Sequence, residues 1–190
     1  MSAAVNYFSA LMHPDAKAVA RGLRRRDPDL LDSLIQQYQY RLFRYLVSVT
    51  GSRETAEDLF QETWIRVLDR GHQYDGESKF ETWLFAIARH LVIDLSRRKG
   101  AESIDLLPEE PETGGLSAWD AVVQHEKQSR VRDSLGRLSA AHREVLLLRF
   151  QEDLNLEEIA AVLGTPLSTV KSRLYRGLEA LRIEMGGSEI

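Results

Sequence analysis

The chain has 190 residues and a formal net charge of −4, with 43% hydrophobic and 28% charged residues, as expected of a globular protein with one medium or two small domains. It contains no cysteine, which excludes disulfides, thiolate metal sites and thiol catalysis. No apolar run approaches the roughly 20 residues of a membrane span. A signal peptide has basic residues before its apolar stretch, and this chain has none there. We therefore expect a cytoplasmic protein without membrane insertion.

Charge is distributed unevenly along the chain. Residues 79–99 carry five basic and two acidic side chains, a net charge of +3, and residues 165–182 carry four basic and one acidic, also +3. Residues 101–127, between these two segments, carry one basic and seven acidic side chains, or −6. Because phosphate contacts depend on local charge, this pattern favours two contact points on one polyanion.

The first part of the chain predicts two long helices. Asp27 and Pro28 suit an N-cap and a first helical position, the apolar residues that follow have helical spacing, and Gly51 suits the C-terminal stop. Ser52 can cap a second helix with its own apolar stripe, which includes Leu68. The outer face of this second helix is different: Asp58, Gln61, Glu62 and Ile65 recur along one strip. Such a strip would suit docking to a basic partner surface, or it is a solvated acidic face.

A small, polar loop at residues 71–77 separates these helices from a third. Ser78 and Glu81 have the spacing of a capping box, and the strongly apolar helix that they open ends near Gly100. Off its apolar stripe lie Trp83, Arg89, His90, Asp94 and Arg97. An aromatic side chain beside cationic groups can stack on unpaired bases and hold a backbone, although Trp83 also suits core packing. The loop is flexible enough to line a pocket for an extruded base.

The pattern breaks after Gly100, where prolines, glycines and acidic residues indicate a flexible linker. No alternating strand pattern occurs, so the predicted fold is all-α, with two small helical domains joined by the acidic linker. The domains are assigned as follows: an N-terminal tail at 1–15, the first domain at 16–99, the linker at 100–121, the second domain at 122–186 and a tail at 187–190.

The second domain contains a helix-turn-helix pattern. A short helix at 156–163 is followed by a turn at 164–167 and by a longer helix that Ser168 can cap, and the second helix of such a motif enters the DNA major groove. Arg176 could pair bidentately with guanine, whereas Lys171 and Arg173 are better placed for phosphates. The residues on or beside the outward face are Ser168, Thr169, Lys171, Ser172, Arg173, Tyr175 and Arg176. The alternative is a charged, solvated helix face.

Nothing in the sequence indicates catalysis. The histidines lack metal-ligand spacing, and neither a phosphate-binding glycine loop nor a nucleophile elbow is present. We therefore expect no enzyme activity, no cofactor and no metal.

Three segments, at 40–68, 80–100 and 138–182, resemble the extracytoplasmic-function (ECF) sigma factors of the sigma-70 family. The resemblance implies that the strip at Asp58, Gln61, Glu62 and Ile65 docks on the β′ clamp of RNA polymerase core, with the β flap as a further contact. It implies that a −35 promoter element meets the outward face of the helix-turn-helix. The residues implied for the −10 element are His72, Tyr74, Asp75, Lys79, Trp83, Arg89, His90, Asp94, Arg97 and Arg98.

The resemblance also has a departure and two further implications. Many relatives have asparagine where His90 stands, so specificity at −10 is expected to differ. The linker would thread through the polymerase, and a separate anti-sigma factor would mask both domains. Two other functions stay open: a transcriptional regulator that binds duplex operator through its helix-turn-helix alone, and a helical interaction adaptor with no role on DNA.

Overall fold

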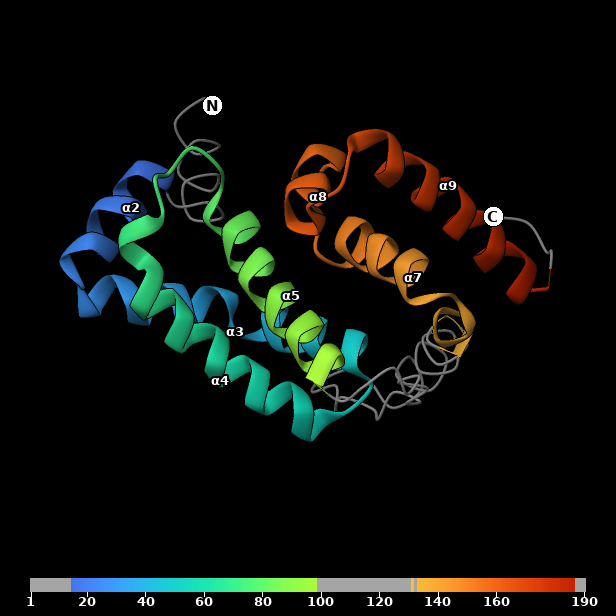
Figure 1. Ribbon diagram of the computed structural model, residues 1–190, viewed down its shortest axis with the longest axis horizontal. Helices are drawn as coiled ribbons and strands as arrows, with labels where there is room; N and C mark the ends of the chain where they lie inside the picture. The colour runs from blue at the N-terminus through green and yellow to red at the C-terminus, as the bar shows by residue number, and fades with distance from the viewer. Residues whose placement is uncertain (1–14, 99–130, 132, 187–190) are drawn as a thin grey trace, which may run out of the picture.

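The computed structural model describes residues 15–98, 131 and 133–186, so the predicted linker and nearly all of both predicted tails lie outside the described residues. The elements are α2 (Ala16–Arg25), α3 (Pro28–Thr50), α4 (Arg53–Arg70), η1 (Gly71–Gln73), α5 (Phe80–Arg98), α7 (Ala140–Leu146), η2 (Leu147–Gln151), α8 (Leu156–Leu163) and α9 (Leu167–Glu184). Every one of these is helical, which confirms the predicted all-α fold (Figure 1). No helix in the described part of the chain is long and apolar enough to cross a membrane.

The predicted boundaries of α3 and α4 are confirmed by their caps. The side chain of Asp27 accepts hydrogen bonds from the backbone N–H groups of the first turn of α3, at 3.1 and 3.3 Å. Gly51 ends that helix in the left-handed conformation, with φ at 67°, where a residue with Cβ would be strained. Ser52 then accepts a hydrogen bond of 3.2 Å from the N–H of Thr55 and begins α4.

The short helix α2 was not predicted, and it changes the interpretation of the loop after α4. Its buried face, which includes Val19 and Leu23, packs against the rest of the first domain. Gly76 lies against the N-terminal end of α2 with φ at 76°, and a Cβ there would stand 2.7 Å from the carbonyl oxygen of Ala16. The segment at 71–78 therefore begins with a 3₁₀ turn and packs against α2, which corrects the prediction of a flexible loop.

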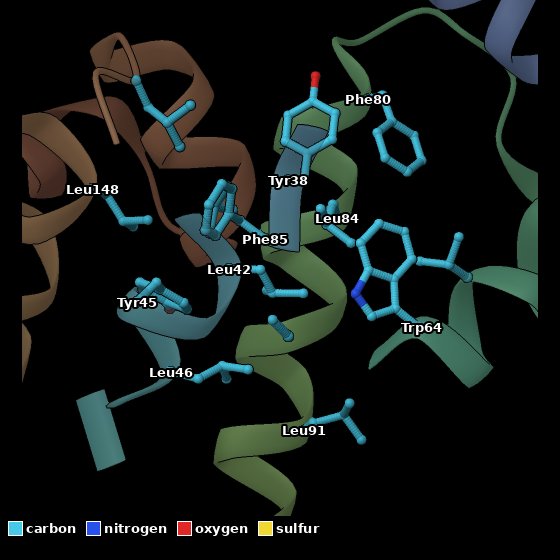
Figure 2. Packing of buried hydrophobic residues seen from close by; sticks show 14 of the residues in the cluster. Tyr38, Leu42, Tyr45, Leu46, Trp64, Phe80, Leu84, Phe85, Leu91 and Leu148 are labelled. Atoms are coloured by element: carbon cyan, nitrogen blue, oxygen red, sulfur yellow. The ribbon is translucent and has the colours of Figure 1, made fainter. Parts of the chain in front are cut away.

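The helix α5 forms the centre of the first domain. Phe80, Leu84, Phe85, Ala88 and Leu91 are all buried on it, and Figure 2 shows Leu84 and Phe85 among the labelled side chains of α3.

The start of α5 differs from the one predicted from a capping box. The helix begins at Phe80, one residue later than a cap at Ser78 requires. The carboxylate of Glu81 accepts a hydrogen bond of 3.2 Å from the guanidinium of Arg41 on α3. The acid that suggested a cap is instead a buried partner of a cation.

In the second domain, α7, η2, α8 and α9 surround a smaller apolar centre. Asn155 and Glu158 form a capping box at the start of α8, and Gly164 ends that helix in the left-handed conformation. The next helix, α9, begins at Leu167 with Pro166 as its N-cap residue, so the predicted cap at Ser168 is wrong. Proline and the turn geometry start this helix without a side-chain hydrogen bond.

The two domains are in direct contact. Helix α5 lies beside α8 (Figure 1), the hydroxyl of Tyr45 on α3 donates a 3.0 Å hydrogen bond to Glu144 of α7, and Arg44 of α3 donates to the carbonyl of Gln151 in η2. Leu148 of η2 points toward Tyr45 and Phe85 in Figure 2. The buried apolar residues of both domains form one contiguous cluster, so the described parts of the chain share a core.

Candidate nucleic-acid interface

The outward face of α9 is accessible. Ser168, Lys171, Ser172, Tyr175 and Arg176 are exposed, with Tyr175 at 71%. Thr169 and Arg173 are half-buried at its margin. Within the ranges that the structure describes, none of the three cations on this face forms an ion pair. The face therefore offers donors that are free to meet a phosphate or a base edge.

Helix α9 is presented in the manner of a recognition helix. Val170 is fully buried beneath it, and Gly177 lets it approach α7, since a Cβ there would stand 3.3 Å from the side chain of Leu146. The side opposite these contacts carries Ser172 and Arg176 at i and i+4. An arginine at such a position can donate bidentately to guanine, and a serine hydroxyl can bond several bases.

The helix α5 offers a mixed strip. His90, Arg97 and Arg98 are exposed, whereas Trp83, Arg89 and Asp94 are half-buried. Nδ1 of His90 lies 2.7 Å from the carbonyl oxygen of Ala86. Because a carbonyl can only accept, Nδ1 carries a hydrogen there, which leaves Nε2 of this exposed side chain as an acceptor.

The ring of Trp83 lies within an aromatic group at the start of α5. Its centroid is 5.1 Å from that of Tyr74 and 5.9 Å from that of Phe80. One part of the indole therefore packs in the core while the rest remains accessible. Both of the expected roles of Trp83, packing and stacking, are compatible with this position.

The segment before α5 contains one residue whose predicted role needs correction. His72 and Asp75 are exposed, but Tyr74 is only 1% exposed and its hydroxyl donates a 2.6 Å hydrogen bond to the carbonyl of Ser78. Burial, helped by the charge of Asp75, raises the pKa of Tyr74 to about 12. Tyr74 therefore packs the segment against the core and does not present its ring to DNA.

Two cations predicted to contact the −10 element already have partners in the second domain. The Nζ of Lys79 lies 2.8 Å from an oxygen of Glu158, and that hydrogen bond raises the pKa of Lys79. The Nε of Arg89 lies 3.1 Å from an oxygen of Glu144. In this conformation, both cations are therefore paired with carboxylates of the second domain.

The outer strip of α4 is exposed as predicted. Asp58 and Gln61 are exposed, Ile65 is 57% exposed, and Glu62 is half-buried and paired with Arg66 at 3.0 Å. Leu68 was assigned to the inner stripe but is also exposed, so that assignment is wrong. Its spacing of three residues from Ile65 could have placed it on the outer strip. The strip therefore ends in two neighbouring apolar side chains.

Comparison with known proteins shows the family to which this chain belongs. The family model Sigma-70 region 2 matches residues 34–102, and Sigma-70, region 4 matches residues 134–182. The ECF RNA polymerase sigma factor SigW of Bacillus subtilis is 30% identical over 174 residues, covering 86% of this chain and 92% of SigW. SigX of the same organism, also an ECF RNA polymerase sigma factor, is 32% identical over 165 residues, covering 80% of this chain and 81% of SigX.

Both sigma-70 regions are present in order, and relatives at least 30% identical match over most of their own length, so the chain belongs to the ECF RNA polymerase sigma factors of the sigma-70 family. A solved structure has the same fold: the sigma factor RpoE of Bartonella quintana in complex with the anti-sigma factor NepR. It has a TM-score of 0.68 at 22% identity, covering 83% of this chain and 98% of that one. Family membership favours a polymerase sigma factor over the operator-binding regulator and the adaptor.

Proposed function

We propose that the protein binds RNA polymerase core and directs it to promoters by reading a −35 element with α9 and a −10 element with α5. The observation that carries this proposal is the exposed, cationic face of α9, which has no partner among the described residues. The protein would turn over no substrate and would act in the cytoplasm on the polymerase. Its contribution is two sets of DNA contacts, which the core enzyme alone would not make.

At the −35 element, the side chains of α9 divide into two groups. Arg176 and Ser172 would read base edges in the major groove, since they stand at the centre of the exposed face. Lys171 and Arg173 flank it and would bind phosphates, with Ser168 and Thr169 adding donors at the helix N-terminus. Tyr175 lies between the two groups and would pack against the backbone.

At the −10 element, α5 would work on unpaired bases. Trp83 would stack, His90 would offer Nε2 to a base edge, and Arg97 and Arg98 would hold phosphates. His72 and Asp75 stand on the adjoining segment and would line a pocket for an extruded base. Unstacking a base costs a few kcal/mol, which contacts from both α5 and this segment would offset.

The strip on α4 would dock the protein on the polymerase. Asp58, Gln61 and Glu62 would contact a basic surface through two carboxylates and an amide. Ile65 and Leu68 are exposed apolar side chains at the end of the strip, and binding would remove them from water. Ile65→Ala is expected to weaken binding to core polymerase by roughly 1–2 kcal/mol. Glu57→Ala on the same helix, whose exposed ion pair with Arg53 is worth little, is the matched control. Equal affinities of the two variants would exclude this strip as the docking surface.

We also propose that an anti-sigma factor regulates the protein by covering both domains. The test of the promoter function itself is transcription in vitro with bacterial core polymerase, the purified chain and fragmented genomic DNA, followed by sequencing of RNA 5′ ends. We expect start sites that share paired −35 and −10 motifs. Folded protein that binds duplex DNA tightly but gives no initiation would support the operator-binding regulator instead.

A further inference from the structure

The contact between the two domains is lined by opposite charges. Among the described residues, the ion pairs given for this contact join carboxylates of the second domain to cations of the first. Glu144 of α7 meets Arg89, and Glu158 of α8 meets Lys79. Glu152, directly after η2, meets both Arg41 and Arg44 of α3. We call this set of three carboxylates and their four cations the interdomain clasp.

Glu152 is the centre of the clasp. Its side chain is fully buried, with 0% exposure. One carboxylate oxygen lies 3.1 Å from Nε of Arg41, and the other lies 3.0 Å from Nη2 of Arg44. The same two guanidinium groups also donate to the backbone carbonyls of Gln151 and Glu152, at 2.7 and 2.6 Å. A buried carboxylate is tolerated only with such neutralising partners.

The backbone at η2 places Glu152 in the contact between the two domains. Leu147–Gln151 is a wide π-type turn, closed by a 3.1 Å hydrogen bond from the N–H of Glu152 to the carbonyl of Leu147. Asp153 follows with a left-handed φ of 54°, which is uncommon for a residue with a side chain. Turns of this kind inside helices are often functional, and here the turn projects Glu152 into the first domain while Asp153 remains 98% exposed.

The contact is incompatible with simultaneous reading of two promoter elements. At 3.4 Å per base pair, elements about 25 base pairs apart lie roughly 85 Å apart along the duplex. In the structure, α5 packs against α8, the first helix of the helix-turn-helix, and Lys79 directly before α5 pairs with Glu158 of α8. Two domains joined in this way cannot reach both elements, so the clasp has to open before promoter binding.

We propose that the clasp is an autoinhibitory contact that keeps the free protein closed, with carboxylates of the second domain standing in for DNA phosphates at Lys79 and Arg89. That Lys79 and Arg89 contact DNA is implied by the resemblance to ECF sigma factors and so rests on the proposed function, whereas the clasp itself rests on the interdomain contacts. Core polymerase opens it by binding each domain separately. The free protein is thereby kept from engaging nucleic acid on its own.

The chemistry of the clasp suits a contact that opens. Desolvating two charges largely cancels their attraction, so a buried ion pair holds less firmly than apolar residues of the same volume would. The Nε of Arg44 is buried without a hydrogen-bond partner among the described residues, which adds a further cost to the closed state.

The absence of cysteine from the chain makes the test direct. Cysteines introduced at Ser33 of α3 and Ala161 of α8, both exposed, carry spin labels that report the distance between the domains in the full-length protein. We expect a single narrow distance distribution in the otherwise unchanged protein and a broad, longer one after Glu152→Gln, which removes the charge and keeps the shape. Asp153→Asn is the matched control, because its carboxylate is exposed and outside the clasp, and it should leave the distance unchanged.

Binding of a random-sequence single-stranded oligonucleotide to the free protein gives a second measurement. If the closed form makes up about nine-tenths of the population, Glu152→Gln should tighten this binding roughly tenfold, and Asp153→Asn should not. If Glu152→Gln does not fold, Glu144→Gln with Glu158→Gln loosens the same contact, since glutamine keeps the capping box of α8. A folded variant with unchanged distance and unchanged affinity would overturn the proposal.

Addition of core polymerase to the labelled protein separates this proposal from the proposed function. Lengthening of the distance together with initiation supports both. Initiation without lengthening would overturn the clasp and leave the promoter function intact. Opening by Glu152→Gln without any initiation on genomic DNA would support the clasp and contradict the promoter function.

Discussion

The helices α5 and α9 would both face DNA, yet they differ in how deeply they are buried and in whether their cations form ion pairs. One side of α5 forms the centre of the first domain, and cations on or near its other side pair with carboxylates of the second. On α9 only Val170 and Gly177 are buried, and its cations on the outward face are free of ion pairs within the described ranges.

The difference follows from what each helix would do. A helix that reads intact duplex needs only an exposed face on a small support, because the bases are already displayed in the groove. A helix that holds unpaired bases needs a rigid position and an adjoining segment, and this demands burial. The same burial places α5 within reach of the second domain. We therefore expect substitutions on α5 to affect folding and DNA contacts together, and substitutions on α9 to affect DNA contacts alone.

The largest expected effect is that of Phe85→Ala. Phe85 is fully buried, and its ring stands edge-on to that of Tyr45 with centroids 5.2 Å apart. Removing it should lower the free energy of unfolding by about 3–5 kcal/mol, measured by urea denaturation. Arg97→Ala, on the exposed end of the same helix, should stay within about 0.5 kcal/mol of the unchanged protein. A loss below about 1 kcal/mol for Phe85→Ala would contradict a structural role for α5.

Arg176→Ala tests the opposite case on α9. The substitution should remove roughly 1–3 kcal/mol of binding free energy at one −35 base pair and relax the base preference there. The free energy of unfolding should stay unchanged. The measurement is transcription in vitro from promoters carrying each base pair at that position. Lys171→Ala serves as comparison, since loss of a phosphate contact should weaken all promoters similarly and reduce the salt dependence. Unchanged base preference after Arg176→Ala would exclude it as a direct reader.

Tyr74→Phe tests the correction made for the segment before α5. Losing the hydroxyl that donates to the carbonyl of Ser78 should cost about 1 kcal/mol of stability at neutral pH. Because the pKa of Tyr74 is raised to about 12 from 10.0, the unfolded chain loses this proton first. The contribution of the hydroxyl to stability is full below pH 10 and is lost as pH rises toward 12. The free energies of unfolding of the unchanged protein and of Tyr74→Phe should therefore converge between these pH values, as measured by denaturation at each pH. A changed −10 preference in Tyr74→Phe would restore a DNA role to this ring.

The smallest expected effect on stability is that of His90→Asn. The imidazole is exposed and bonds only the backbone of its own helix, so unfolding should change by less than about 0.5 kcal/mol. If Nε2 reads a base edge, promoter selection at −10 should change nonetheless, which start-site sequencing of both proteins would show. An identical set of start sites would mean that His90 does not select bases.

Local sequence determined much of this protein. The caps at Asp27, Gly51 and Ser52 act within a few residues of themselves, so they set α3 and α4 whatever surrounds them. The helical period likewise identified the outward face of α9 and the strip on α4, because a period of 3.6 residues assigns faces without knowledge of the neighbours. The resemblance that carried the family also lies in the sequence itself.

Only the tertiary structure decided the rest, because burial depends on residues distant in sequence. Tyr74 and Glu81 are polar residues near a helix start, and nothing local shows that one would be buried against the core and the other paired with Arg41. The pairing of Glu152 with Arg41 and Arg44 joins positions more than a hundred residues apart. The clasp could not have been read from either segment alone, since opposite charges become partners only when the chain brings them together.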